Sequence, residues 1–327
     1  MLLMANDFLP VTTKFIYYFT GPLPFDVYIQ LADDKYTKIY HKNSEHDPNQ
    51  IYRYENKDLK ILYVSNEEKN LFGSFLCELI DQFNTGKGTI DKAKMIDIMK
   101  TSLELTYEKI ISENDELETN MQWATHQVKG ALHLLEDDIS SAIEVFKALA
   151  GDIQLLKHSY MVSLFSLVLA KKLGINNPKN LMNIGLGALL HDVGHTRVNK
   201  ELFTKQNLTP KEWEEIKDHP QIGLKIVDFT KGISSDIRSI IMQHHEQYNG
   251  RGYPNRLNNS LIFPPAKIVA IADGFCSLLS KASYGDTQYS ADQAIKMMKD
   301  DIGHYDPEFL NTFEMIIIGD KKKNSRK

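Results

Sequence analysis

The chain has 327 residues, of which 42% are hydrophobic and 25% charged, a composition typical of a folded globular protein with about two domains. Its net charge is −5, but residues 321–327 carry five positive charges and no negative one, so the remainder carries −10. This acidic remainder excludes a protein that binds duplex nucleic acid through a broad basic surface, because such binding needs Lys and Arg side chains to neutralise phosphates.

Cysteine spacing and hydropathy exclude two further classes. Cys77 and Cys276 lie far apart in the sequence and form no CxxC pattern, which argues against a disulfide framework and against a thiolate zinc site. The N-terminus has no basic region before an apolar run, and no stretch reaches the roughly 18 apolar residues of a membrane span. We therefore expect a cytoplasmic protein with no transmembrane segment.

The first 83 residues are predicted to form a small α+β module. Four runs rich in aromatic and β-branched residues, separated by Gly, Pro, Asn and Asp, predict strands. These runs are at 15–19, 25–31, 36–41 and 60–65. A helix over about 67–82 would close the module, 1–83, which we interpret as a sensory or partner-binding domain.

The rest of the chain is predicted to be almost wholly helical, because apolar residues recur every three or four positions from Ile90 onward. Two long connecting helices are expected at about 91–117 and 119–149. The expected boundaries are 84–150 for the linker and connecting helices, 151–315 for a helical domain and 316–327 for a basic, disordered tail. The fold class is therefore mainly α, a helical bundle preceded by a small α+β domain.

One helix start in this domain is explicit in the sequence. Thr209 is placed to cap a helix, with Pro210 at the first helical position and Glu212 reaching back three residues, which together form a capping box. A helix is therefore expected from Pro210.

Histidines and aspartates of the helical domain adjoin apolar residues instead of lying in polar loops. A buried carboxylate such as Asp192 or Asp273 needs a cation or strong donors, because desolvating its charge costs several kcal/mol. Bundles build metal sites from helices that each offer one or two His or Asp side chains to a common interior. The candidate ligands are His158, His191, Asp192, His219, His244, His245 and Asp273.

This set of imidazoles and carboxylates, without thiolates, favours Fe, Mn, Co, Ni or Zn. Seven ligands exceed what one tetrahedral ion uses, so we predict two metals bridged by Asp192. Two such ions activate a water and neutralise a phosphoryl group, which would handle phosphate without a basic surface. The alternative is a helical scaffold whose histidines are core residues, since a single His on an apolar face is more often structural.

Six motifs in order make residues from about 155 to 312 resemble the HD-GYP domain, a branch of the HD metal-dependent phosphohydrolases associated with cyclic di-GMP. They are HS at 158–159, LLHDVG at 189–194, LTPKEWEEIKDHPQIG at 208–223, HHEQYNGRGYP at 244–254, IFPPAKIVAIAD at 262–273 and YDPEF at 305–309. The resemblance implies an HD-type helical fold, two divalent ions with Fe or Mn favoured, and the seven candidate ligands with Asp192 bridging.

The resemblance also implies a reaction, in which a bridging hydroxide attacks phosphorus and opens cyclic di-GMP to a linear dinucleotide. Asp192 and His195 are the expected catalytic residues. The expected substrate contacts are Lys205, Arg251, Gly252, Tyr253 and Pro254, of which the last three match the GYP signature. The expected partners are cyclic di-GMP and diguanylate-cyclase-type or other signalling proteins, which would bind the GYP loop or the N-terminal module.

Several positions depart from the family's pattern. His195 stands where members commonly have a Lys associated with substrate phosphate, and Ala282 and Gly285 stand where two cationic residues hold the dinucleotide. Gln154 stands where some members have a Glu that supports a third metal, which favours two metals here. These departures leave a second hypothesis open: a catalytically weak or inactive signalling adaptor that binds metals and protein partners.

Overall fold

The computed structural model describes residues 7–13, 21–32, 35–45, 61–86, 90–111, 117–137, 154–205, 207–228, 233–279 and 289–319. The chain divides into two compact units, Met1–Thr106 and Tyr107–Lys327, which are described separately. The strand predicted at 15–19, the positions Ala282 and Gly285, and residues 320–327 of the predicted tail lie outside the described residues. The tail was predicted to begin at 316, but residues 316–318 are the end of the last described helix, Pro307–Ile318.

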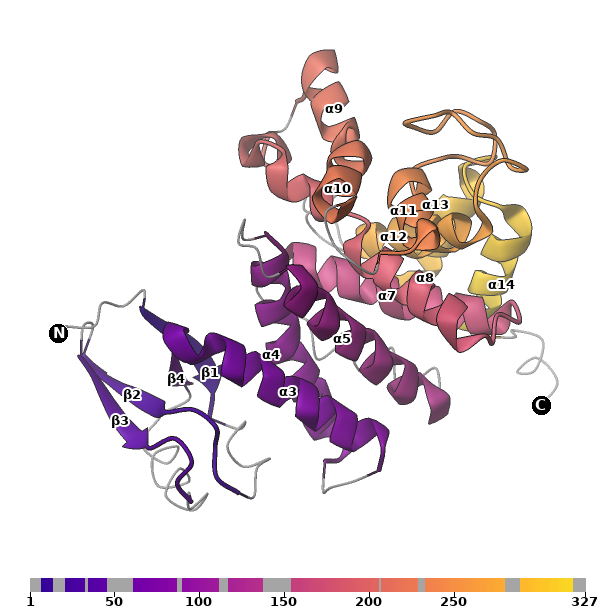
Figure 1. The fold of residues 1–327 in the computed structure, drawn as a ribbon. Coiled ribbons are helices and arrows are strands. Elements are labelled where there is room, and N and C mark those ends of the chain that lie inside the picture. The colour runs from indigo at the N-terminus through magenta and orange to yellow at the C-terminus, as the bar shows by residue number, and fades with distance from the viewer. Residues whose placement is uncertain are drawn as a thin grey trace. The chain divides into compact units, whose positions relative to one another are not determined.

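The first unit contains a four-stranded antiparallel sheet with the strand order β1-β4-β2-β3 (Figure 1). Its strands are β1 (Phe8–Thr12), β2 (Val27–Ala32), β3 (Lys35–Tyr40) and β4 (Ile61–Ser65). The last three confirm runs predicted from the sequence. The helix expected over about 67–82 is also present, as the 3₁₀ turn η2 (Asn66–Glu68) followed by α3 (Lys69–Asn84).

Strand β1 was not predicted. It has five residues and contains Pro10, whose ring removes a backbone donor and normally argues against a strand. The structure accommodates it because β1 is an edge strand, paired on one side only, with β4. A short edge strand with a proline carries almost no sequence signal, so it becomes visible only through its partner.

The core of this unit lies between one face of the sheet and α3. Val27 and Ile29 alternate with less buried residues along β2, the period of two that places one face of a strand inward. Phe25, just before β2, meets Phe72 and Phe75 of α3 edge to face, with ring centroids 5.1 and 5.4 Å apart. Burial of these rings holds the helix on the sheet.

The second unit is a helical bundle, which confirms the predicted fold class. The predicted connecting helices appear as α4 (Lys92–Ile111), which begins in the first unit, and α5 (Leu117–Asp137). The bundle continues with α7 (Gln154–Lys172), α8 (Pro178–Leu190), η3 (Val193–Arg197), η4 (Lys200–Phe203), α9 (Pro210–Lys217), α10 (His219–Asp228), α11 (Ser235–Gln243), α12 (Pro264–Leu279), α13 (Ala291–Asp300) and α14 (Pro307–Ile318).

Helix α7 is central, because it packs against α8 and α12, while α8 packs against α11 and α10 packs against η3. Phe165 of α7, Phe275 of α12 and Phe313 of α14 form an edge-to-face aromatic cluster with ring centroids 5.1 to 5.9 Å apart. Helix α9 begins at Pro210 with the predicted capping box of Thr209 and Glu212. None of the described helices is long and apolar enough to cross a lipid bilayer.

The contact between η3 and α10 is unusually close, and glycine makes it possible. A Cβ atom at Gly194 would overlap the carbonyl oxygen of His219 and would lie 2.7 Å from the amide nitrogen of Gly223. Only hydrogen fits at this position. The start of α10 is thereby held directly against the turn that follows Asp192.

We expect Gly194→Ala to destabilise the protein by about 1–3 kcal/mol, because the added methyl must push α10 away from η3. Gly223→Ala is the matched control, since its Cβ would meet Gly194 and Ile241 at 3.3 Å, which small shifts can relieve. Urea unfolding of the two variants measures the difference. Equal destabilisation by both would contradict the close contact at Gly194.

Candidate metal centre

The seven predicted ligands come together in the second unit, and most of them lie at helix ends. His158 lies on α7 and Asp273 on α12, both within helices. His191 is the C-cap of α8 and Asp192 the N-cap of η3. The remaining three also lie at helix ends: His219 begins α10, His244 is the C-cap of α11, and His245 follows His244.

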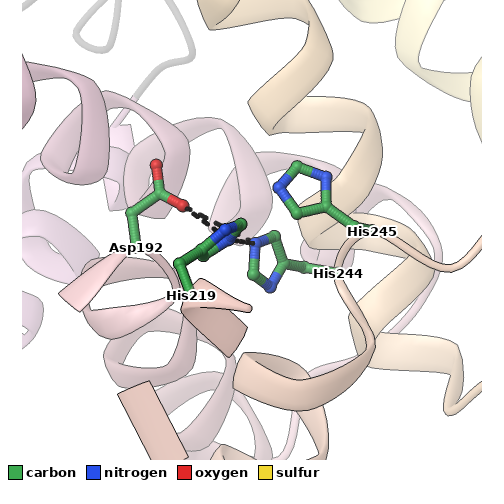
Figure 2. A group of neighbouring side chains, drawn as sticks. All are labelled: Asp192, His219, His244 and His245. Atoms are coloured by element: carbon green, nitrogen blue, oxygen red, sulfur yellow. Dashed lines mark hydrogen bonds and ion pairs between the residues drawn. The ribbon is translucent and has the colours of Figure 1, made fainter. Parts of the chain in front are cut away.

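Asp192 belongs to two groups of ligand atoms, in each of which the atoms lie within 4.8 Å of one another. One group is Asp192, His219, His244 and His245, and the other is His158, His191 and Asp192. Figure 2 shows the first group, with Asp192, His219 and His244 joined by short contacts and the ring of His245 beside them. Asp273 adjoins the second group, with its Oδ1 2.9 Å from His158 Nε2.

The two carboxylate oxygens of Asp192 face different groups. Oδ1 lies 3.3 Å from His219 Nε2 and 3.6 Å from His244 Nε2. Oδ2 lies 3.3 Å from His191 Nε2 and 3.9 Å from His158 Nε2. One carboxylate therefore points an oxygen into each cluster of imidazoles, which is the arrangement that a bridging ligand needs.

Three of the imidazoles are fixed in one tautomer by the backbone. The Nδ1 atoms of His191, His219 and His244 lie 2.7, 2.9 and 2.8 Å from the carbonyl oxygens of the residues three positions earlier, Ala188, Ile216 and Ile241. A carbonyl only accepts, so each Nδ1 donates its proton there and leaves the lone pair on Nε2. This is how proteins orient metal-binding histidines.

The cluster leaves buried lone pairs unsatisfied. Among the described residues, His191 Nε2 and Asp192 Oδ1 are buried without a hydrogen bond of acceptable geometry, although imidazole nitrogens and carboxylate oxygens approach to 3.3 Å. His219 Nε2 and His244 Nε2 face each other at 3.1 Å. Converging lone pairs repel unless a cation or a proton lies among them, so the residues present fit a metal ion with nitrogen and oxygen ligands.

The electrostatics favour the same interpretation. Burial lowers the pKa of His219 to about 3, and burial together with His244 and His219 lowers the pKa of His245 well below its usual range. Burial alone would raise the pKa of Asp192, but His191 and His195 outweigh it and keep the pKa well below its ordinary value. Neutral imidazoles beside an ionised carboxylate are the protonation states that bind metals.

The pKa of His191 is raised, whereas the pKa values of His219 and His245 are lowered. Burial opposes the charged form of His191, but the carboxylates of Asp192 and Asp273 outweigh burial and raise its pKa to about 9. The buried carboxylates therefore create a strong preference for positive charge at this point. A divalent cation would satisfy that preference.

His195, the predicted catalytic histidine, lies beside the first group. Its Nε2 is 3.3 Å from Asp192 Oδ1, and its ring stacks on that of His219 with centroids 3.9 Å apart. It lies on η3, one helical turn after Asp192, so the same turn positions both residues.

Two residues of the GYP loop, Gly252 and Tyr253, lie against the segment that carries His245, whereas Arg251 is exposed. Tyr253 stacks on His245 with ring centroids 4.7 Å apart, and its amide donates to the His245 carbonyl. A Cβ at Gly252 would overlap the backbone of Gln247, so this loop lies directly on the chain that follows the two ligands. Arg251 is exposed, and Pro254 follows Tyr253 through a cis peptide bond.

Lys205 is engaged elsewhere. Its Nζ lies 2.6 and 2.9 Å from the two carboxylate oxygens of Glu212, the capping residue of α9, and this hydrogen bond is the main cause that lowers the pKa of Glu212 to about 2. Lys205 therefore stabilises the start of α9 and is not directed at the cluster by any contact in the described part of the chain. The side chain of Gln154 lies outside the described residues.

Two residues with a place at the site were not predicted. Lys217 lies with its Nζ 5.9 Å from the ring centroid of Tyr253, so a cation adjoins the ring that covers His245. Glu246 is buried and accepts from the amides of Asn255 and Leu257 at 2.7 and 2.8 Å. A carboxylate directly after two histidines was a signal for Glu246, but nothing in the sequence identified its partners.

Comparison with known proteins identifies the family. A family model described as HD domain matches residues 134–309. The chain belongs to the HD domain family. A solved structure titled as an HDG"Y"P protein, Bd1817 of Bdellovibrio bacteriovorus, has the same fold, with a TM-score of 0.66 and 23% identity over 96% of this chain and 100% of that one. The predicted resemblance to HD-GYP proteins is confirmed.

Curated relatives carry related names. A cyclic di-GMP phosphodiesterase of Pseudomonas aeruginosa, PA4108, is 30% identical over 48% of this chain, and a cyclic di-GMP phosphodiesterase of Thermotoga maritima is 28% identical over 54%. A 3'3'-cGAMP-specific phosphodiesterase of Vibrio cholerae is 27% identical over 66%. The chain matches 37%, 49% and 38% of the length of these relatives, respectively.

We expect Asp192→Ala to remove more bound metal than His245→Ala, because Asp192 belongs to both ligand groups and His245 to one. Elemental analysis of the purified proteins measures metal per chain. His126→Ala is the control, since His126 lies on α5, outside both groups, and should retain the wild-type content. Equal losses from Asp192→Ala and His245→Ala would contradict the shared role of Asp192.

We expect Glu246→Ala to loosen the loop at 247–257 and to cost about 2 kcal/mol of stability, because two backbone amides lose a charged acceptor. Trypsin should then cleave after Arg251 or Arg256 about tenfold faster. Glu215→Ala, an exposed change on α9, is the control. Unchanged cleavage would show that Glu246 does not hold the loop.

Proposed function

We propose that this protein is a metal-dependent phosphodiesterase that hydrolyses cyclic di-GMP. The observation that carries the proposal is the carboxylate of Asp192, which points one oxygen into each of two histidine clusters. The names of the relatives support the substrate class, since they act on cyclic dinucleotides.

The proposed site holds two divalent ions, with Fe or Mn favoured and Zn, Ni or Co compatible with the same ligands. Asp192, His219, His244 and His245 would hold one ion, and His158, His191, Asp192 and Asp273 the other. Two such ions supply activation of a water and neutralisation of a phosphoryl group. The acidic chain would then bind phosphate through the site instead of through its surface.

His195 is the proposed catalytic imidazole. Its Nε2 lies within 3.3 Å of Asp192 Oδ1, so it adjoins the carboxylate common to both ion sites. An imidazole there can donate a hydrogen bond to a phosphate oxygen or give a proton to the leaving oxygen. It cannot supply the fixed positive charge of the lysine that related proteins commonly have.

Substrate contacts are proposed for the GYP loop and nearby cations. Arg251 is exposed in this loop, and Lys217 lies over the ring of Tyr253 while paired with Glu214, so Arg251 can approach a dinucleotide bound at the cluster directly and Lys217 by leaving Glu214. Gly252, Tyr253 and Pro254 would form the wall of the site next to His245. Lys205 would contact substrate only by leaving Glu212.

The domain roles extend this proposal. Residues 1–83 would form a sensory or partner-binding domain that acts on the helical domain, 151–315, through the segment 84–150. The GYP loop or this N-terminal domain would bind signalling proteins, including those of the diguanylate-cyclase type. The proposed place of the protein is the cytoplasm, where cyclic di-GMP is a signal.

We expect the full-length protein loaded with Mn²⁺ or Fe²⁺ to hydrolyse cyclic di-GMP, and chelation or Asp192→Ala to abolish turnover. His195→Gln should lower kcat about 100-fold, the scale of a lost general acid. Chromatography of the nucleotide products measures the rates, with His126→Ala as the control and 3'3'-cGAMP as a comparison substrate. Wild-type turnover no faster than that of Asp192→Ala would favour the adaptor hypothesis.

A further inference from the structure

Five aromatic rings form a continuous row across the candidate metal centre. Phe203 meets His195 edge to face with centroids 5.0 Å apart, and His195 stacks on His219 at 3.9 Å. His219 meets His245 edge to face at 4.9 Å, and His245 stacks on Tyr253 at 4.7 Å. The row therefore begins on η4 and ends in the GYP loop, with Asp192 beside its central histidines.

Phe203 ends this row as an exposed ring. Its neighbour Leu202 is buried with Val198 and Ile216, which anchors η4 and leaves Phe203 on the outer side of the turn with 46% of its surface exposed. The planes of Phe203 and His195 are 88° apart, so His195 covers at most one face of the phenyl ring. No other ring among the described residues contacts Phe203.

The position of Phe203, more than its exposure, indicates a ligand. Single exposed apolar side chains are common on protein surfaces and need no explanation. Phe203, however, is one ring away from Asp192, because His195 contacts both. A phosphodiester held at Asp192 would place its attached nucleosides beside the cluster, within reach of the exposed Phe203 ring.

The opposite end of the row differs. Tyr253 stacks on His245 and has Lys217 near its ring, so that end offers an aromatic ring together with a cation. Phe203 offers only a flat apolar surface. Base stacking on such a surface contributes to nucleotide binding without any positive charge, which suits a site whose usual cationic residues are replaced.

We propose that the exposed ring of Phe203 is a subsite that stacks a purine base of the nucleotide substrate. This inference rests on the proposed function, since it assumes that the phosphate of a nucleotide binds at the metal centre. Phe203 would determine the preference for nucleotides over simple phosphates, while Asp192 and the histidines bind the phosphate through the ions.

The first test measures binding without turnover. Isothermal titration of the Mn²⁺-loaded full-length protein gives the Kd of GMP and of inorganic phosphate. Phe203→Leu keeps apolar volume and loses the flat ring, so it should weaken GMP about tenfold and leave phosphate unchanged. Phe203→Trp should restore GMP binding to within about threefold of wild type, and Met315→Leu, an exposed change on α14, is the matched control.

Three results would overturn the subsite. The first is a wild-type protein that binds GMP no more tightly than inorganic phosphate. The second is a Phe203→Leu variant with an unchanged Kd for GMP. The third is a Phe203→Leu variant that binds GMP and phosphate equally more weakly, which would mean that Phe203 acts by supporting His195 or the ions.

The second test separates this inference from the proposed function. With cyclic di-GMP, Phe203→Leu should raise KM about tenfold at nearly constant kcat, a pattern that loss of metal would not produce. If wild-type protein fails to turn over cyclic di-GMP but GMP binding still depends on the ring at position 203, the hydrolase proposal fails and the base subsite holds. A kcat that falls while KM stays constant would contradict the subsite.

Discussion

The buried carboxylate of Asp192 is the interaction on which the second unit depends. Removing such a charge from water costs several kcal/mol unless cations or donors surround it. The chain meets that cost by bringing imidazoles from α7, α8, α10 and α11 to its two oxygens. The bundle can close around this charge only because Gly194 lets the start of α10 approach η3 without a side chain between them.

Backbone carbonyls at helix ends orient three of the imidazole rings in the site. The Nδ1–H groups of His191, His219 and His244 each donate a hydrogen bond to the backbone carbonyl three residues earlier. The same local geometry therefore occurs at three places. Each imidazole then presents Nε2 to the interior. Backbone carbonyls therefore define the orientation of these three imidazoles, whereas His158 is oriented by the side chain of Asp273.

The chain and its candidate metal site are both negatively charged. The chain is acidic, and the carboxylates of Asp192 and Asp273 make the site itself anionic, strongly enough to hold the pKa of His191 at about 9. Binding of phosphate at this site, as proposed above, would therefore require positive charge from bound ions. Lys217 adds a cation only at the Tyr253 side, which leaves aromatic surface as the main feature of the Phe203 side.

Sequence patterns alone were sufficient to predict the fold class, the resemblance to HD-GYP proteins and the candidate ligands. Residue type and helical spacing were sufficient for this, because an inward-facing histidine or aspartate is visible from its apolar neighbours. Strand β1 was missed because a proline-containing edge strand has no such pattern. The correct predictions and the missed strand both depended on the pattern of residues within one short segment of the chain.

The way in which the two clusters share Asp192 is visible only in the three-dimensional arrangement of the helices. The contacts of the Asp192 oxygens with the two clusters reach residues up to 52 positions away, and the contact of His158 with Asp273 spans 115 positions. Three further contacts also depend on how the chain turns in space: the pairing of Lys205 with Glu212, the stacking of Tyr253 on His245, and the hydrogen bonds of Glu246 to backbone amides of the GYP loop. Sequence spacing does not encode such directions, because they follow from how helix ends are packed against one another.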